Sequence, residues 1–171
     1  MSVSLYDVSI PTFLHTLRSL KNILEKAAAH AETRKFDPNV LAASRLFPDM
    51  LPLSRQVQIA TDAAKGAAAR LSGTEPPKFE DNETTLADLI LRITKTVDYL
   101  QSFKPEQFEG AETRVITIKT PRATFNFTAV DFVRHWALPN FFFHTTTTYA
   151  LLRQGGVEIG KADFLGAVPQ S

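Results

Sequence analysis

The sequence predicts an all-α fold, a four-helix bundle with one long crossover and a short β-hairpin before the last helix. Apolar residues recur at helical spacing in four long segments, and two short segments before the last of these alternate with period two. Proline-rich and glycine-rich stretches separate them. With 171 residues, 44% of them hydrophobic, we expect a single domain over residues 1–171.

The first helix is expected from about Ser9 to His30. Pro11 then lies near its first position, where the missing N–H costs little. Its apolar stripe comprises Phe13, Leu17, Leu20, Leu24, Ala27 and Ala31. His15 and His30 lie off this stripe, so we interpret both as solvated surface residues.

A proline-broken connection over residues 33–52, with one helical turn near residues 38–44, leads to the second helix. This helix is expected over residues 51–71, with Asp49 as its N-cap. Gln56 lies on the flank of its buried face, whereas Gln58 lies well outside that face. Gln56 is therefore the glutamine expected to face the bundle.

The third helix and the hairpin follow a turn-rich linker over residues 72–82. Thr84 is expected to cap the helix, which continues to about Phe103. Residues 114–119 and 123–127 form the predicted hairpin. Its inward-facing residues are expected to be Ile116, Ile118, Phe125 and Phe127. Two strands alone are not stable, so the hairpin must lie against the helices.

The last helix, residues 128–153, holds two of the four histidines and the only tryptophan. Thr128 and Asp131 resemble a capping box, and Gly155 ends the helix. Pro139 removes one helical hydrogen bond, so a kink with a freed carbonyl at His135 is expected.

On a regular helical wheel this segment has one mainly apolar face. Its members are Phe132, Trp136, Pro139, Phe143, Thr147 and Ala150. Asn140 and His144 are stacked on the flank of that face, four residues apart. His135 falls nearly opposite His144, so the two histidines cannot hold one ion from a regular helix.

Composition excludes several classes of site. The formal net charge is +1 and no dense basic run occurs, so neither nucleic acid nor an anionic membrane is an expected partner. The absence of cysteine excludes thiolate chemistry and Cys-ligated metals. No signal peptide or long apolar span is evident, so we expect a cytoplasmic protein.

Three segments carry a family resemblance: RLFPDMLPLSRQVQIATD (45–62), ALPNFFFHTTTTYALLR (137–153) and GVEIGKADFLG (156–166). They closely resemble a bacterial domain-of-unknown-function family that is grouped with the DinB/YfiT-like metalloenzymes, and the resemblance spans nearly the whole chain. It implies a DinB-like four-helix bundle and a homodimer. The wider superfamily includes metal-dependent hydrolases and thiol transferases, in which one histidine of the second helix and an HxxxH pair on the last helix hold a divalent ion.

The resemblance places Gln56 at the second-helix histidine, Asn140 at the first histidine of the pair and His144 at the second. Amide oxygens are weak ligands for zinc or nickel, so a divalent metal is disfavoured and we assign neither metal ligands nor a cofactor. What the resemblance leaves is a pocket, with Gln56, Asn140, Trp136 and Phe143 as ligand-binding candidates. His144 is the candidate catalytic residue.

Three hypotheses remain open, and the sequence does not decide whether the protein is an enzyme. The first is a dimeric DinB-like bundle with a degenerate metal site, which binds a small molecule or acts as a scaffold. The second is a metal-dependent hydrolase or thiol transferase whose non-standard site combines His144 with Gln56, with Asn140 or with a carboxylate brought in by folding, such as Asp49 or Asp62. The third is a metal-free isomerase or lyase that uses His144 as acid and base.

Overall fold

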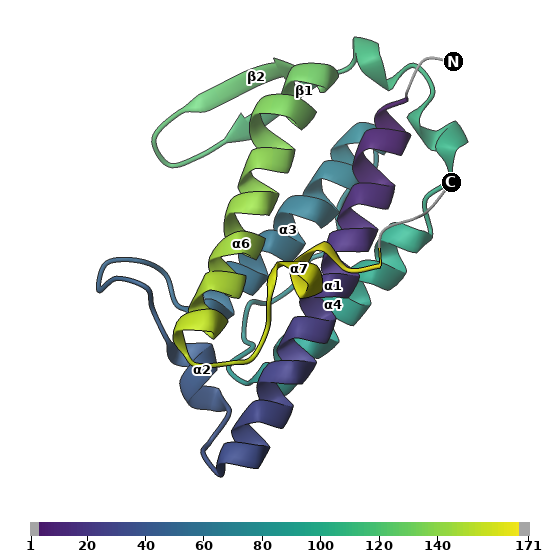
Figure 1. The fold of residues 1–171 in the computed structure, drawn as a ribbon. Coiled ribbons are helices and arrows are strands. Elements are labelled where there is room, and N and C mark those ends of the chain that lie inside the picture. The colour runs from purple at the N-terminus through teal and green to yellow at the C-terminus, as the bar shows by residue number, and fades with distance from the viewer. Residues whose placement is uncertain (1–3, 168–171) are drawn as a thin grey trace.

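The computed structural model describes residues 4–167 and confirms the helical bundle. Its four long helices are α1 (Leu5–Arg34), α3 (Leu53–Ser72), α4 (Leu86–Gln101) and α6 (Leu138–Gln154) (Figure 1). The shorter elements are α2 (Asn39–Ala43), two 3₁₀ turns (Pro105–Phe108 and Ala111–Thr113), α5 (Ala129–Phe132) and α7 (Lys161–Leu165). None of the helices within residues 4–167 is long and apolar enough to cross a membrane.

α3 and α4 pack side by side and run in the same direction. Near the start of α3, Gln58 donates to Glu83, which lies just before α4 (3.0 Å). Further along α3, Asp62 pairs with Arg92 of α4 (2.9 Å). A parallel pair needs a connection that returns along the bundle. Residues 73–85, called here the α3–α4 connection, make this return and form the long crossover.

α1 begins earlier than the sequence predicted, at Leu5. The Ser4 hydroxyl accepts a hydrogen bond from the Asp7 N–H, and the Asp7 carboxylate accepts one from the Ser4 N–H, each at 3.1 Å. This capping box satisfies two N–H groups that would otherwise be orphaned, so the helix nucleates before Pro11. The expected start at Ser9 is wrong, and Pro11 lies within the helix on an exposed position.

Two further predicted caps need correction. α3 begins at Leu53 directly after Pro52, and no side chain caps it, so Asp49 is not its N-cap. α4 is capped by Thr85 instead of Thr84. The Thr85 hydroxyl accepts from the Asp88 N–H (3.1 Å), while the Asp88 carboxylate accepts from the Thr85 N–H (3.3 Å).

The predicted hairpin is present as β1 (Val115–Lys119) and β2 (Thr124–Thr128), with Ile118 opposite Phe125 and Ile116 opposite Phe127. The two isoleucines are buried as expected, but Phe125 remains 39% exposed. Its ring lies 5.3 Å from that of Trp136, and the ring of Phe127 lies 5.8 Å from it. The hairpin thus packs on the start of the last helical segment (Figure 1).

The last helical segment contains a π turn over Val133–Ala137. There the Leu138 N–H bonds to the Val133 carbonyl, five residues back, immediately before Pro139, which has no N–H to offer. The extra residue changes the phase of α6. Phe143 is therefore 56% exposed and Pro139 is also exposed, while Phe141 and Thr145 are buried. Pro139, Phe143, Thr147 and Ala150 still share one face of α6, where they border one hollow, but this face does not continue that of Phe132 and Trp136 across the π turn as the regular wheel predicted.

Candidate functional site

The structure brings Gln56 of α3 and His144 of α6 together. The Gln56 Oε1 atom lies 2.7 Å from His144 Nδ1, and Gln56 Nε2 donates to the Leu51 carbonyl at 3.0 Å. Because the amide nitrogen is engaged with a carbonyl, the amide oxygen faces the imidazole, and His144 Nδ1 must donate. His144 Nε2 is then left as an acceptor with a free lone pair.

The His144 side chain is half-buried. Burial penalises the charged imidazolium and lowers the pKa of His144 below its ordinary value. A neutral imidazole with Nδ1 protonated is therefore the state expected near pH 7. Such a group can accept a proton at Nε2 but carries no charge of its own.

Asn140 does not join the Gln56–His144 pair. Its amide nitrogen donates to the Trp136 carbonyl at 2.7 Å, one turn back in the π segment. The remaining amide oxygen accepts no hydrogen bond from residues 4–167. Asn140 thus supports the π turn and retains one free acceptor.

A cavity of about 260 Å³ lies between α3, the hairpin and the π turn. Its lining comprises Ile59, Asp62, Ala63, Arg70, Ile118, Phe132, Trp136, Ala137 and Asn140. Gln56 precedes Ile59 by three residues on α3, and His144 follows Asn140 by four on α6. The Gln56–His144 pair therefore lies one helical turn beyond the cavity wall.

Trp136 and Asn140 both line this cavity, whereas Gln56, His144 and Phe143, which the sequence placed in the same pocket, do not. Phe143 borders an open hollow together with Leu46 and Phe142. The π turn causes this separation because it rotates α6 after Trp136. The ligand-binding roles predicted for Gln56, Asn140, Trp136 and Phe143 stay predictions.

The residues at the three superfamily positions do not fit a three-histidine metal site. Only His144 supplies an imidazole, the Gln56 oxygen already accepts from it, and the Asn140 nitrogen is bound to a carbonyl. Within residues 4–167 no three His, Asp or Glu side chains gather into a group that could hold a metal. Asp62, one of the two carboxylates considered, is paired with Lys65 and Arg92. The other, Asp49, is exposed in the loop before α3.

The sequence analysis missed a buried arginine. Arg92 of α4 is 2% exposed, and its Nε donates to the Thr61 hydroxyl at 2.7 Å. Nη2 lies 2.9 Å from Asp62 Oδ1 and 2.9 Å from Asp81 Oδ1. One signal was available, since Arg92 lies three residues after Leu89 and four before Thr96, both of which are buried.

The α3–α4 connection covers this arginine. The ring of Phe79 lies beneath Lys65 Nζ (3.9 Å) and near the Arg92 guanidinium (5.1 Å). Gln58 is 1% exposed because the connection covers it, so the prediction that it lies well outside the buried face is wrong. Lying two residues from Gln56, Gln58 points to another side of α3 and takes no part in the His144 pair.

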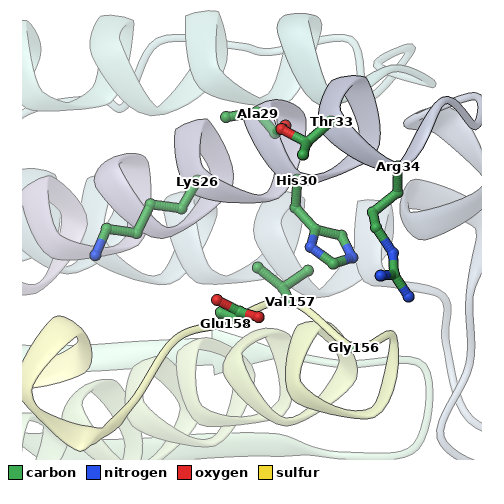
Figure 2. A pocket seen from close by; sticks show the side chains of 8 residues that line it. All are labelled: Lys26, Ala29, His30, Thr33, Arg34, Gly156, Val157 and Glu158. Carbon is green, nitrogen blue, oxygen red and sulfur yellow. The ribbon is translucent and has the colours of Figure 1, made fainter.

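A larger hollow of about 470 Å³ lies between the end of α1 and the segment after α6 (Figure 2). Lys26, His30 and Arg34 of α1 face Glu158 and Val157 across it. His30 is half-buried here, with its ring 5.8 Å from that of Phe36, so its expected solvated position is only partly correct. Lys26 already pairs with Asp163 at 2.5 Å. None of the predicted site residues lies in this hollow.

The chain is similar to a known protein family and to a solved structure. Residues 5–165 match the model of a family described as a domain of unknown function, DUF1993. A crystal structure of a DinB family member protein from Shewanella denitrificans has 45% sequence identity and a TM-score of 0.90. The match covers 98% of this chain and 94% of that one. A search of curated proteins found no significant match.

Proposed function

We infer, from the premise that this chain belongs to the DUF1993 family and has the fold of a DinB family member, that it binds a small molecule. In this proposal the bundle keeps the superfamily's pocket and has a degenerate metal site. The ligand occupies the cavity bordered by Trp136 and Asn140, beside the Gln56–His144 pair.

The observation that carries the proposal is the hydrogen bond between Gln56 and His144. The Leu51 carbonyl fixes the Gln56 amide, and the amide in turn fixes the imidazole, at the positions where the superfamily places metal-binding histidines. The hydrogen bond satisfies both side chains, and loss of either one would leave the other unsatisfied. In this proposal the pair holds the imidazole in one tautomer beside the ligand cavity.

Trp136 makes the proposal directly testable. It is the only tryptophan of the chain and lines the cavity, so its fluorescence reports occupancy. We expect some members of a small-molecule library to change this fluorescence and to raise the melting temperature of the wild-type protein. His144→Ala and Gln56→Ala should weaken that binding, whereas His135→Ala, at a histidine whose side chain is 70% exposed, should not.

A scaffold without a ligand predicts a different pattern. No compound would change the Trp136 signal or the melting temperature, and His144→Ala would only lower stability. That result would overturn the proposal. Stoichiometric metal in tag-free wild-type protein, lost in His144→Ala, would instead support the metal-dependent hydrolase or thiol transferase hypothesis.

His144 also supports a second candidate function, metal-free acid–base catalysis by an isomerase or lyase. Nδ1 donates to Gln56, Nε2 is free, and burial lowers the pKa of His144, so the ring is ready to take up a proton near pH 7. Turnover of a bound ligand that disappears in His144→Ala, while binding persists, would support this candidate. Equal turnover by that variant would exclude it.

We also propose that the chain forms a homodimer through the outer face of α6. Phe143 is 56% exposed and Phe142 36%. Phe47, which follows Leu46 of the same hollow in the sequence, is 64% exposed. Exposed aromatic clusters of this kind favour protein contacts. Light scattering should give a dimer for the wild-type protein and a monomer for Phe143→Glu. Val115→Glu, at a hairpin residue that is 69% exposed, is the matched control and should stay dimeric. A wild-type monomer would contradict the proposal.

A further inference from the structure

We propose that the cavity beside Trp136 takes a small monoanionic carboxylate with an apolar body and a hydrogen-bond donor at its other end. This inference rests on the proposed function, because it names the class of ligand for the same cavity. Its three elements are a free guanidinium, two free acceptors and an apolar wall, each supplied by different residues of the lining.

Arg70 supplies the anion-binding end. Its Nη1 donates to the Gly66 carbonyl at 2.9 Å, and no carboxylate of residues 4–167 lies within 4.0 Å of it. The other N–H groups of the guanidinium donate to no residue of that part of the chain. A guanidinium with free parallel donors is the side chain best suited to a carboxylate.

Gly66 positions this guanidinium. A Cβ at Gly66 would lie 2.5 Å from Arg70 Nη1, and Arg70 supplies every atom that it would meet within 4 Å. Glycine inside a helix costs about 1 kcal/mol relative to alanine. Here it leaves room for the Arg70 side chain to fold back one turn along α3, about 6 Å toward Asp62.

The donor-binding end consists of Asp62 and Asn140. Lys65 and Arg92 both pair with Asp62 Oδ1, each at 2.9 Å, and Oδ2 accepts no hydrogen bond from residues 4–167. Asn140 likewise has a free Oδ1, since only its nitrogen is bound. Two free acceptors on one cavity favour a ligand that brings an O–H or N–H group.

Charge decides between a cationic and an anionic ligand. The three acids of the network, Asp62, Asp81 and Glu83, are matched by Arg55, Lys65 and Arg92. Asp62, the acid in the cavity lining, is already paired with Lys65 and Arg92, so the positive charge of Arg70 has no ion-pair partner within residues 4–167. A monoanion neutralises this charge, whereas an amine would meet Arg70 and the two cations already on Asp62.

The apolar wall determines the size and polarity of the middle part of the ligand. Ile59, Ile118, Phe132 and Trp136 line the cavity between its two polar ends. At about 260 Å³ the cavity is smaller than the sites that take drug-sized molecules. A single substituted ring or a short branched chain therefore suits it, and an aromatic ring could also pack against Trp136.

Three probes separate these features, with binding followed by Trp136 fluorescence and calorimetry at low salt. They are 4-hydroxyphenylacetate, phenylacetate without the hydroxyl, and tyramine with an ammonium in place of the carboxylate. We expect the first to bind at least about tenfold more tightly than tyramine and several-fold more tightly than phenylacetate.

Variants then test the assigned residues. Arg70→Gln should weaken binding of 4-hydroxyphenylacetate by about tenfold or more. Arg18→Gln makes the same charge change at an exposed residue of α1 and should not alter this binding. Gly66→Ala should weaken binding without loss of thermal stability, because alanine favours the helix but displaces the guanidinium.

The outcomes distinguish the two proposals. If tyramine binds as tightly as the carboxylates, or if Arg70→Gln and Gly66→Ala bind like the wild type, the ligand class is wrong although the cavity is a binding site. If none of the probes binds and the wider library also leaves Trp136 fluorescence unchanged, the proposed function itself fails.

Discussion

Arg92 Nη1 lies 3.1 and 3.0 Å from the two carboxylate oxygens of Glu83, and this contact fastens the α3–α4 connection to the bundle. The arginine is almost fully buried, while the Glu83 side chain is 15% exposed. An ion pair of this kind contributes little net stability relative to apolar residues, but removal of one partner leaves a buried charge without compensation.

Arg92→Met should therefore destabilise the protein. We expect the free energy of unfolding to fall by about 1–3 kcal/mol, because Glu83 loses its cationic partner while Asp81 keeps Arg55. Urea denaturation measures the change. Lys21→Ala removes a solvated ion pair on α1 and should cost less than about 1 kcal/mol. Equal effects of the two substitutions would show that Arg92 does not hold the connection.

Asp81 should make stability sensitive to acid. Burial raises the pKa of Asp81, but its hydrogen bond with Arg55 and the nearby charge of Arg92 outweigh this, so the net pKa is lowered. Because the folded-state pKa lies below the unfolded value of about 3.9, the stabilisation is present above that pH and is lost as pH falls through the folded-state pKa.

The melting temperature should thus fall steeply below about pH 4, and Asp81→Asn should flatten that fall while lowering the plateau at neutral pH. Asp37→Asn is a suitable control, because Asp37 is an exposed residue whose carboxylate has no ion pair with residues 4–167. If the melting temperature of Asp81→Asn falls at low pH as steeply as that of the wild-type protein, Asp81 is not the source of the acid sensitivity.

His144 should titrate below its ordinary range and carry its proton on Nδ1. Burial lowers the pKa of His144, so the unfolded chain takes up the proton first, and stability from this group is lost as pH falls below about 6.5. Imidazole nitrogen shifts in NMR report both properties. Gln56→Glu places a carboxylate beside Nδ1 and should raise the pKa of His144 above the wild-type value. A wild-type pKa at or above 6.5 would contradict the burial argument.

Thr85, the observed cap of α4, and Asp49, the predicted cap of α3, should differ in their contribution to stability. Thr85→Ala removes the hydroxyl that accepts from the Asp88 N–H and should cost about 1 kcal/mol of unfolding free energy. Asp49→Ala, at the position that the sequence suggested as the cap of α3, should change stability by no more than about 0.5 kcal/mol. A reversed order of these two effects would restore the original assignment of Asp49.

The sequence was sufficient for the helices and the hairpin because each has a strong local pattern. The stripe of α1 and the alternation of Ile116 and Ile118 both depend on which residues avoid water, and the structure buries them accordingly. Pairing of Gln56 with His144 was within reach because the resemblance placed both at neighbouring positions between two helices.

Two parts of the site could not be predicted from periodicity. Arg92 and Gln58 are buried by the α3–α4 connection, whose path depends on the ion pairs of Asp81 and Glu83 with arginines of α3 and α4 and not on local periodicity. Phe143 was misplaced because the wheel assumed one helical phase throughout. A π turn has no reliable sequence signal, although Pro139 showed where the regular pattern would break.

The π turn also makes the position of His144 depend on how the residues before α6 are wound. If Val133–Ala137 were wound as a regular α-helix with no change in chain length, all of α6 would be rotated by about 100° relative to the segment before it. His144 would then turn away from Gln56, and a neighbouring residue would take its place. Spacing within α6 is therefore not enough to transfer functional positions between family members. The winding upstream of Pro139 has to be matched before the side chains downstream can be compared.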